Sequence, residues 1–176
     1  MSRLPVYLAN RRKTEHFERI YEMIKVLFVC HGNICRSPMA EFMMKDMTTR
    51  LGIADEFEIA SAATSDEECW NGVGNPVYPP ARAELSKHGI GCEGKRARQM
   101  TRADYERYDY LIGMEDMNVR NMLRILGGDP DGKVSKLLDY TDRGGNISDP
   151  WYSGRFAETY ADIEEGLKGF LSHLGY

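Results

Sequence analysis

The sequence predicts an α/β fold with a single domain, in which a central parallel four-stranded sheet carries helices on both faces. Apolar runs rich in β-forming residues alternate along the chain with segments whose apolar residues recur every three or four positions. Strands that alternate with helices favour parallel pairing and crossover helices on both faces. The length of 176 residues fits one domain with a substantial core.

The first strand is predicted over residues 24–29, an apolar run of β-forming residues that stops at Cys30. A short loop containing Gly32 and Asn33 follows, and Ser37-Pro38 then has the form of an N-cap with proline at the first helical position. The helix continues at helical spacing through Met39, Phe42, Met43, Met47 and Leu51. A loop between a strand and a helix N-terminus is a favourable place for an anion, so we expect a phosphate-binding loop here.

The remaining elements follow the same alternation. The further strands are predicted over 57–61, 109–114 and 133–138. The further helices are predicted over 79–88, from the capping-box sequence at 101–104, over 119–126 and over 156–170. Two long polar segments, 64–80 and 139–152, are predicted as loops, and loops of this length are usually functional or mobile. Cys30 stands at the carboxyl end of a strand, where parallel sheets bind ligands.

The loop carries a cysteine at its start and an arginine at its end, Cys30 and Arg36. A helix N-terminus, converging backbone N–H groups and a nearby guanidinium all favour a thiolate over a thiol. The same groups would hold a tetrahedral oxyanion, with Arg36 contacting two of its oxygens. The alternative is an inert buried cysteine, but the coincidence with Gly32, Asn33 and Ser37-Pro38 favours phosphoryl transfer to sulfur.

The segment from Cys30 to Glu41, CHGNICRSPMAE, resembles the signature of the low-molecular-weight protein-tyrosine phosphatases, and the resemblance extends from about Met23 to the C-terminus. It implies a phosphatase domain over 23–176 and a non-catalytic N-terminal extension over 1–22. It also implies that Cys30 is the nucleophile and Arg36 the phosphate clamp. The loop residues that would bind the substrate are His31, Gly32, Asn33, Ile34, Cys35 and Ser37.

The resemblance assigns supporting roles as well. Ser37 would donate its hydroxyl to the Cys30 sulfur, a role compatible with N-capping. Ser61 and His88 would brace Asn33, and Cys35 could form a reversible disulfide with Cys30. Family members usually have Met-Asp after the third strand, where this chain has Met114-Glu115-Asp116, so the choice between Glu115 and Asp116 as the support of Arg36 stays open.

A cysteine-dependent phosphatase also needs a general acid, and the candidate is Asp149. From the residues alone, Asp149-Pro150 is more typical of an ordinary turn. The resemblance favours catalysis, because the family carries its general acid and base in an Asp-Pro-aromatic motif near the C-terminus. Trp151 and Tyr152 would then flank the cleft, although they could also be core aromatics. With Trp70 or Tyr78 they would form a slot deep enough for phosphotyrosine but too deep for phosphoserine.

Three alternatives to a tyrosine phosphatase stay open. Arsenate reductases share the architecture and use two further cysteines, but Cys69 and Cys92 do not fall where that relay places them. Phosphoarginine phosphatases favour threonine at the loop position that Ile34 holds here. A phosphate-binding module without a working acid would keep the same loop and show no turnover.

Composition limits the partners that we expect. The net charge of −4 and the pI near 5.6 argue against nucleic acid, and no apolar run has the length of a membrane span. The histidines and cysteines show no metal-ligand spacing, so we expect no metal and no cofactor. Without an apolar secretory segment, a reducing cytoplasm is the expected location. The expected partners are tyrosine-phosphorylated proteins, and the expected state is a monomer or weak dimer.

Overall fold

The computed structural model describes residues 22–176, so the predicted N-terminal extension lies outside the described residues except for Glu22. Four parallel strands form one sheet in the order β2-β1-β3-β4, which confirms the predicted fold class. The strands are β1 (Ile24–Cys30), β2 (Phe57–Ala63), β3 (Tyr110–Gly113) and β4 (Val134–Lys136). The α-helices are α1 (Arg36–Arg50), α2 (Pro79–Lys87), α3 (Asp104–Arg107), α4 (Asp116–Leu126), α5 (Pro150–Ser153) and α6 (Phe156–Leu174), and the 3-10 turns are η1 (Ala54–Glu56), η2 (Trp70–Gly72) and η3 (Leu137–Tyr140).

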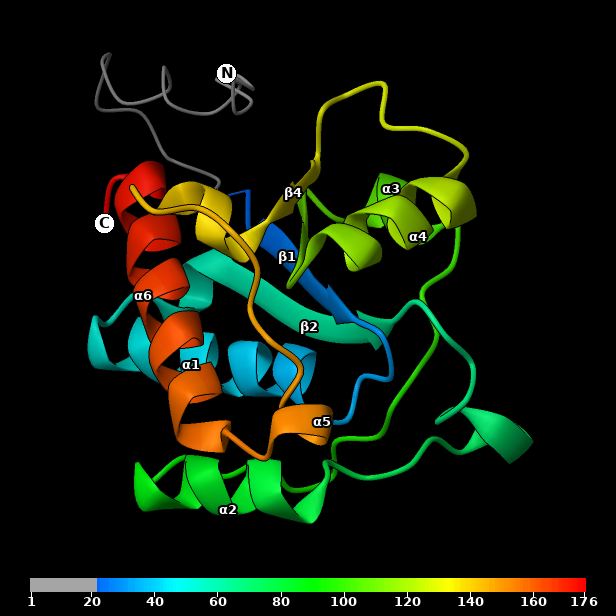
Figure 1. Ribbon diagram of the computed structural model, residues 1–176. Coiled ribbons are helices and arrows are strands. Elements are labelled where there is room, and N and C mark those ends of the chain that lie inside the picture. The colour runs from blue at the N-terminus through cyan, green and yellow to red at the C-terminus, as the bar shows by residue number, and fades with distance from the viewer. Residues whose placement is uncertain (1–21) are drawn as a thin grey trace.

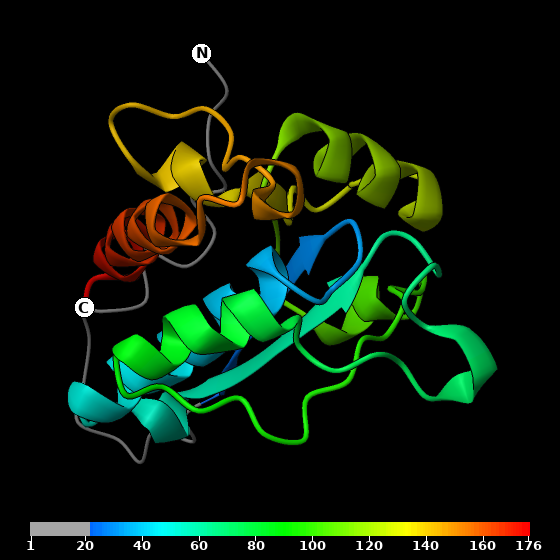
Figure 2. The same ribbon diagram turned by 60° about the horizontal axis from the view of Figure 1, so that its bottom comes forward.

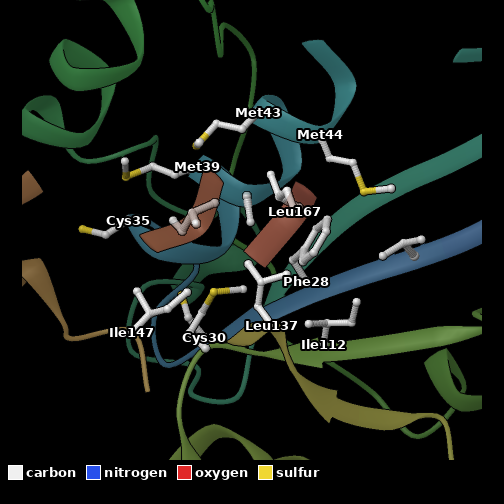
Figure 3. Packing of buried hydrophobic residues seen from close by; sticks show 14 of the residues in the cluster. Phe28, Cys30, Cys35, Met39, Met43, Met44, Ile112, Leu137, Ile147 and Leu167 are labelled. Atoms are coloured by element: carbon white, nitrogen blue, oxygen red, sulfur yellow. The ribbon is translucent and has the colours of Figure 1, made fainter. Parts of the chain in front are cut away.

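Helices cover both faces of the sheet (Figure 1). Alternate residues of β1 pack against the helices of the two faces. Val26 and Phe28 pack in the larger core cluster, together with side chains of α1, α2 and α6. Figure 3 shows part of this cluster, to which Phe28 of β1 and Leu167 of α6 both belong. Leu27 and Val29 pack in the smaller cluster, with side chains of α3 and α4. The period of two therefore divides the side chains of the buried part of β1, residues 26–30, between two cores.

The fourth strand is shorter than predicted, because Leu137 and Leu138 belong to η3 and not to β4. Both leucines are fully buried in the same core cluster, whereas consecutive residues of a strand would point to opposite faces. The helix α6 approaches η3 closely at Gly166, where an added Cβ would lie 2.5 Å from Leu137 Cγ. The 3-10 turn thus packs both leucines between the sheet and α6.

Two boundaries near the predicted loop and the Asp-Pro sequence also differ from expectation. The helix α1 begins at Arg36 with Cys35 as its N-cap, so Ser37 lies inside the first turn and the prediction that it caps the helix is wrong. The second boundary lies in the predicted loop over 139–152, which contains α5, with Asp149 as its N-cap and Pro150 in its first turn. Both differences place a polar side chain where it can serve the site described below.

The topology places the loop 31–35 at the point where the chain order of the sheet reverses. The strand β1 pairs with β2 on one side and with β3 on the other, so a crevice forms beyond its carboxyl end. In Figure 2 the helix α5 lies next to this loop, which joins β1 to α1. No helix of the described part of the chain has the length and apolar character needed to cross a membrane.

Candidate active site

The sulfur of Cys30 lies at the base of the loop, where two hydrogen-bonding groups contact it. The Ser37 hydroxyl is 3.0 Å from Sγ, and the backbone N–H of Asn33 donates to Sγ over 3.3 Å. Asn33 has φ +58°, which makes it the one non-glycine residue with positive φ in the described part of the chain. Asparagine tolerates this conformation, and here the conformation folds the loop back over the sulfur.

The side chain of Asn33 is held by three hydrogen bonds. Its Nδ2 donates to Ser37 Oγ at 2.8 Å and to Ser61 Oγ at 2.9 Å. Its Oδ1 accepts from the backbone N–H of Arg98 at 3.2 Å. The structure thus brings together Asn33, Ser37 and Ser61 from the loop, α1 and β2. The contact with Ser61 is one that the resemblance implies, whereas the contact of Asn33 with Ser37 was not expected. Each of these side chains is buried.

His88 is not part of this network, contrary to expectation. It follows the last residue of α2, and its ring stacks on Tyr160 of α6 with 3.7 Å between the ring centroids. Its Nε2 lies 3.5 Å from a carboxylate oxygen of Glu84. Because α2 ends beside α6, the histidine contacts that helix and not the loop.

Sequence reasoning missed two charged residues behind the loop, Glu41 and Lys95. Ser61 donates to Glu41 Oε2 at 2.5 Å, and Lys95 Nζ lies 3.0 Å from the same oxygen. Lys95 Nζ also donates to the backbone carbonyl of Ser61 at 3.0 Å. The signal in the sequence was weak: Glu41 stands between Ala40 and Phe42, but its burial, which calls for a partner, is seen only in the structure.

The guanidinium of Arg36 is 1% exposed and contacts three acceptors. Its Nη1 donates to the carbonyl of Ile147 at 3.0 Å and lies 3.1 Å from Glu115 Oε2, while its Nη2 donates to Asp149 Oδ2 at 2.8 Å. Burial opposes the charge, but the neighbouring Cys30, Asp149 and Glu115 outweigh it and raise the pKa of Arg36. The arginine therefore stays cationic in a buried position.

The structure decides between the two acids that follow the third strand. Glu115 contacts both terminal nitrogens of Arg36. Asp116 is exposed and pairs with Lys136, whose Nζ lies 2.7 Å away. Glu115 is therefore the residue that supports the arginine, and it occupies the position where the family usually has aspartate.

Asp149 connects the loop before α5 to the arginine. Its Oδ1 accepts from the backbone N–H of Trp151 at 3.1 Å, which caps the short helix, and its Oδ2 accepts from Arg36. The carboxylate is partly exposed and lines the same cavity as Cys30. The Asp-Pro sequence thus starts a helix and places a carboxylate in the cavity that Cys30 also lines.

The cavity above Cys30 has a volume of about 140 Å³. Trp151 and Tyr152 form one wall, and they are 52% and 87% exposed. Glu67 and Glu68 also line the cavity. The ring of Tyr78 packs at a tilt against Trp151, with 4.7 Å between the ring centroids, and so supports this wall. Trp70, the other aromatic expected near the cleft, is exposed and is not one of the residues that line the cavity.

The remaining loop residues line the floor and rim of the cavity. His31 and Gly32 lie at the rim, where His31 Nε2 is 3.1 Å from Glu67 Oε2. Ile34 is buried and presents an apolar side chain to the cavity. Burial, followed by the proximity of Cys30, raises the pKa of Cys35, so this second cysteine stays a thiol at neutral pH. All four cysteines are free.

The fold and the site together define an α/β protein with an anion-binding loop, a cysteine sulfur at its floor, and an arginine and a carboxylate in the same cavity. The family model described as low molecular weight phosphotyrosine protein phosphatase matches residues 25–176. The chain therefore belongs to this family, and it is a hydrolase of that class.

Individual relatives agree with the family assignment. The low molecular weight phosphotyrosine protein phosphatase of Rattus norvegicus is 45% identical over 151 residues, which cover 83% of this chain and 92% of the relative. The crystal structure of YfkJ from Bacillus subtilis superposes with a TM-score of 0.81 at 33% identity, covering 86% of this chain and 94% of that one. The crystal structure of DARP, a Drosophila arginine phosphatase, gives a TM-score of 0.75 at 28% identity, covering 87% and 99%.

Proposed function

We propose that this chain hydrolyses phosphotyrosine in proteins through a cysteinyl-phosphate intermediate. Cys30 is the nucleophile, Arg36 the phosphate clamp and Asp149 the general acid and base. The observation that carries the proposal is the cavity itself, which holds these three side chains together. The geometry around the sulfur supports it, because a backbone N–H and a hydroxyl lie within hydrogen-bond distance of Sγ.

The first step forms a sulfur–phosphorus bond and breaks the bond between phosphorus and the tyrosine oxygen. The Cys30 thiolate supplies the electron pair, and the proton of Asp149 goes to the leaving phenolate oxygen. In the second step Asp149 takes a proton from water, whose oxygen attacks phosphorus. The sulfur then leaves as a thiolate, inorganic phosphate is released, and the hydroxyl of Ser37 stabilises the charge on sulfur.

The contact between Arg36 and Asp149 has a consequence for substrate binding. Nη2 of Arg36 donates to Asp149 Oδ2 at 2.8 Å. A phosphate dianion offers stronger acceptors, so it competes with Asp149 for this nitrogen. Binding would free the carboxylate to face the leaving oxygen while Glu115 keeps the guanidinium in place.

The walls of the cavity support phosphotyrosine as the substrate. Trp151 and Tyr152 present aromatic surface beside the loop, and Ile34 adds an apolar contact near its floor. A phenyl ring would pack on these surfaces, whereas the guanidinium of phosphoarginine would find no hydrogen-bond acceptor on Ile34. The resemblance to the Drosophila arginine phosphatase makes phosphoarginine the second candidate, and it must be tested directly.

A competition among phosphopeptides tests the proposal. Peptides of one sequence carrying phosphotyrosine, phosphoarginine or phosphoserine are supplied together, and the release of each product is followed by mass spectrometry. We expect turnover of phosphotyrosine that is lost in Cys30→Ser, together with a phosphorylated Cys30 in acid-quenched wild-type protein. Preferred turnover of phosphoarginine, or thioredoxin-dependent reduction of arsenate without peptide hydrolysis, would contradict the proposal.

A further inference from the structure

We propose that Glu41 and Lys95 are positioning residues for the reaction, because they fix the direction of the hydrogen bonds that reach Cys30. The proposal rests on the function proposed above and concerns the same site. Neither residue lines the cavity, so neither contacts the substrate. They act through Ser61, Asn33 and Ser37.

The two residues form a buried ion pair behind the loop. Glu41 lies on α1 with its carboxylate inside the core, and the side chain of Lys95 is 12% exposed. Lys95 Nζ contacts Glu41 Oε2 and the carbonyl of Ser61, both at 3.0 Å. Although burial favours the neutral acid, Lys95, Lys45 and Ser61 outweigh it and lower the pKa of Glu41. Glu41 is therefore a carboxylate at neutral pH, and a carboxylate can only accept hydrogen bonds.

That property sets the direction of the next hydrogen bond. Since Glu41 only accepts, the Ser61 hydroxyl must use its one hydrogen on Oε2, at 2.5 Å. Ser61 Oγ is then free to accept, and it accepts from Asn33 Nδ2 at 2.9 Å. The N–H of Arg98, which donates to Asn33 Oδ1, fixes the same orientation of the amide independently.

This series of hydrogen bonds ends at the sulfur of Cys30. The second hydrogen of Asn33 Nδ2 goes to Ser37 Oγ at 2.8 Å, so Ser37 accepts from that side. Its own hydroxyl hydrogen then has two acceptors, the Cys30 sulfur at 3.0 Å and the carbonyl of Ala62 at 3.4 Å. The sulfur is nearer and carries the negative charge in the thiolate form, so it takes the hydrogen. The negative charge on Glu41 thus keeps Ser61 an acceptor for Asn33, and Asn33 in turn holds Ser37 with its hydroxyl beside Cys30.

The orientation matters most when the sulfur leaves phosphorus. In that step negative charge develops on Sγ, and a hydroxyl already directed at it requires no reorganisation. Without the carboxylate, Ser61 can turn its hydrogen toward Asn33 Nδ2, while the Arg98 N–H still holds the amide in place. Two donors then face each other, and Asn33 is held less firmly against Ser37. Lys95 keeps the carboxylate ionised from within the protein.

The chain offers a matched control in Lys45. Its Nζ pairs with the other oxygen of Glu41, Oε1, at 2.6 Å, and the side chain is 43% exposed. Lys45→Met removes a cation from the same carboxylate but leaves Oε2 and its contacts with Ser61 and Lys95 intact. If the lysines acted only by balancing the charge of Glu41, both substitutions would lower kcat. The proposed role predicts that only the substitution of Lys95 lowers it.

The experiment compares Lys95→Met, Glu41→Gln and Lys45→Met in the full chain, with p-nitrophenyl phosphate as substrate and rapid acid quenching. We expect Lys95→Met and Glu41→Gln to lower kcat about tenfold with KM changed less than about twofold, because a misdirected charge-assisted hydrogen bond affects the transition state. A larger fraction of Cys30 should be phosphorylated at steady state, because breakdown of the intermediate is slowed. Lys45→Met should keep the wild-type kcat, and Lys95→Arg should restore most of it.

A double substitution separates this role from general support of the fold. In Ser37→Ala the end of the chain of hydrogen bonds is missing, so adding Lys95→Met should lower kcat no further. A second, independent loss in the double variant would overturn the proposal, as would an unchanged kcat in folded Lys95→Met. If Glu41→Gln fails to fold, the two substitutions of Lys95 and the double variant still decide. An inactive wild-type chain would instead refute the proposed function on which the inference rests.

Discussion

The floor and the walls of the cavity are built in opposite ways. At the floor, Cys30, Asn33 and Arg36 are all buried, and the hydrogen bonds that fix them come from several elements. At the walls, Trp151 and Tyr152 are largely exposed and belong to a helix of four residues. Buried groups with satisfied hydrogen bonds keep one arrangement, whereas exposed side chains can adjust. We infer that the floor determines the chemistry and that the walls select the substrate.

Asp149 connects the two regions, and its replacement should have a larger effect than a substitution confined to either the floor or the walls. Asp149→Asn keeps an acceptor for the N–H of Trp151, and so keeps the cap of α5, but it cannot supply a proton. We expect kcat with phosphotyrosine peptides to fall about 10²–10³-fold, in the range typical of a lost general acid. Steady-state kinetics with aryl phosphates of graded leaving-group pKa measure the effect.

The leaving group provides the control for this substitution. A good leaving group such as p-nitrophenolate needs little protonation, so Asp149→Asn should slow its release far less than that of phosphotyrosine. Equal losses for all leaving groups would mean that Asp149 acts through Arg36, whose Nη2 it contacts, and not as the acid.

Glu115→Gln tests the floor alone, and we expect a smaller but clear effect. The substitution keeps the size of the side chain and removes one of the negative charges beside the buried guanidinium. We expect kcat/KM to fall about 30-fold, because a hydrogen bond between charged groups is lost beneath the phosphate. Asp116→Asn is the matched control, since Asp116 pairs with Lys136 at the surface and should stay within about twofold of wild type. Equal effects of the two substitutions would refute the assignment of Glu115 as the support.

The sequence predicted the floor better than its surroundings, and the physical reason lies in the range of the interactions. Cys30, Asn33, Arg36 and Ser37 fall within one short segment, so their spacing already defines the loop. Lys95 contacts Ser61 and Glu41 only because the segment after α2 returns to the edge of the sheet. No local pattern encodes such a contact.

The misplacement of His88 has the same origin. At the end of a predicted helix its position along the chain was clear, but the direction of α2 relative to α6 was not. Stacking on Tyr160 depends on how two helices pack, which is a tertiary property. The opposite holds for the sheet, where hydrophobic runs and their alternation with helices were enough to predict four parallel strands.

Substitutions of the wall should have the smallest effect and should alter binding more than chemistry. Trp151→Ala removes the indole that lines the cavity and packs against Tyr78, so a bound phenyl ring loses one of its packing surfaces. We expect KM for phosphotyrosine peptides to rise about fivefold with kcat nearly unchanged, as for the loss of one aromatic pair. Trp70→Ala is the matched control, because it makes the same substitution at a tryptophan that does not line the cavity. It should leave both kcat and KM at wild-type values. A large fall in kcat for Trp151→Ala would show that this wall also positions Asp149, whose Oδ1 accepts from the N–H of residue 151. The division of roles between the floor and the walls would then be refuted.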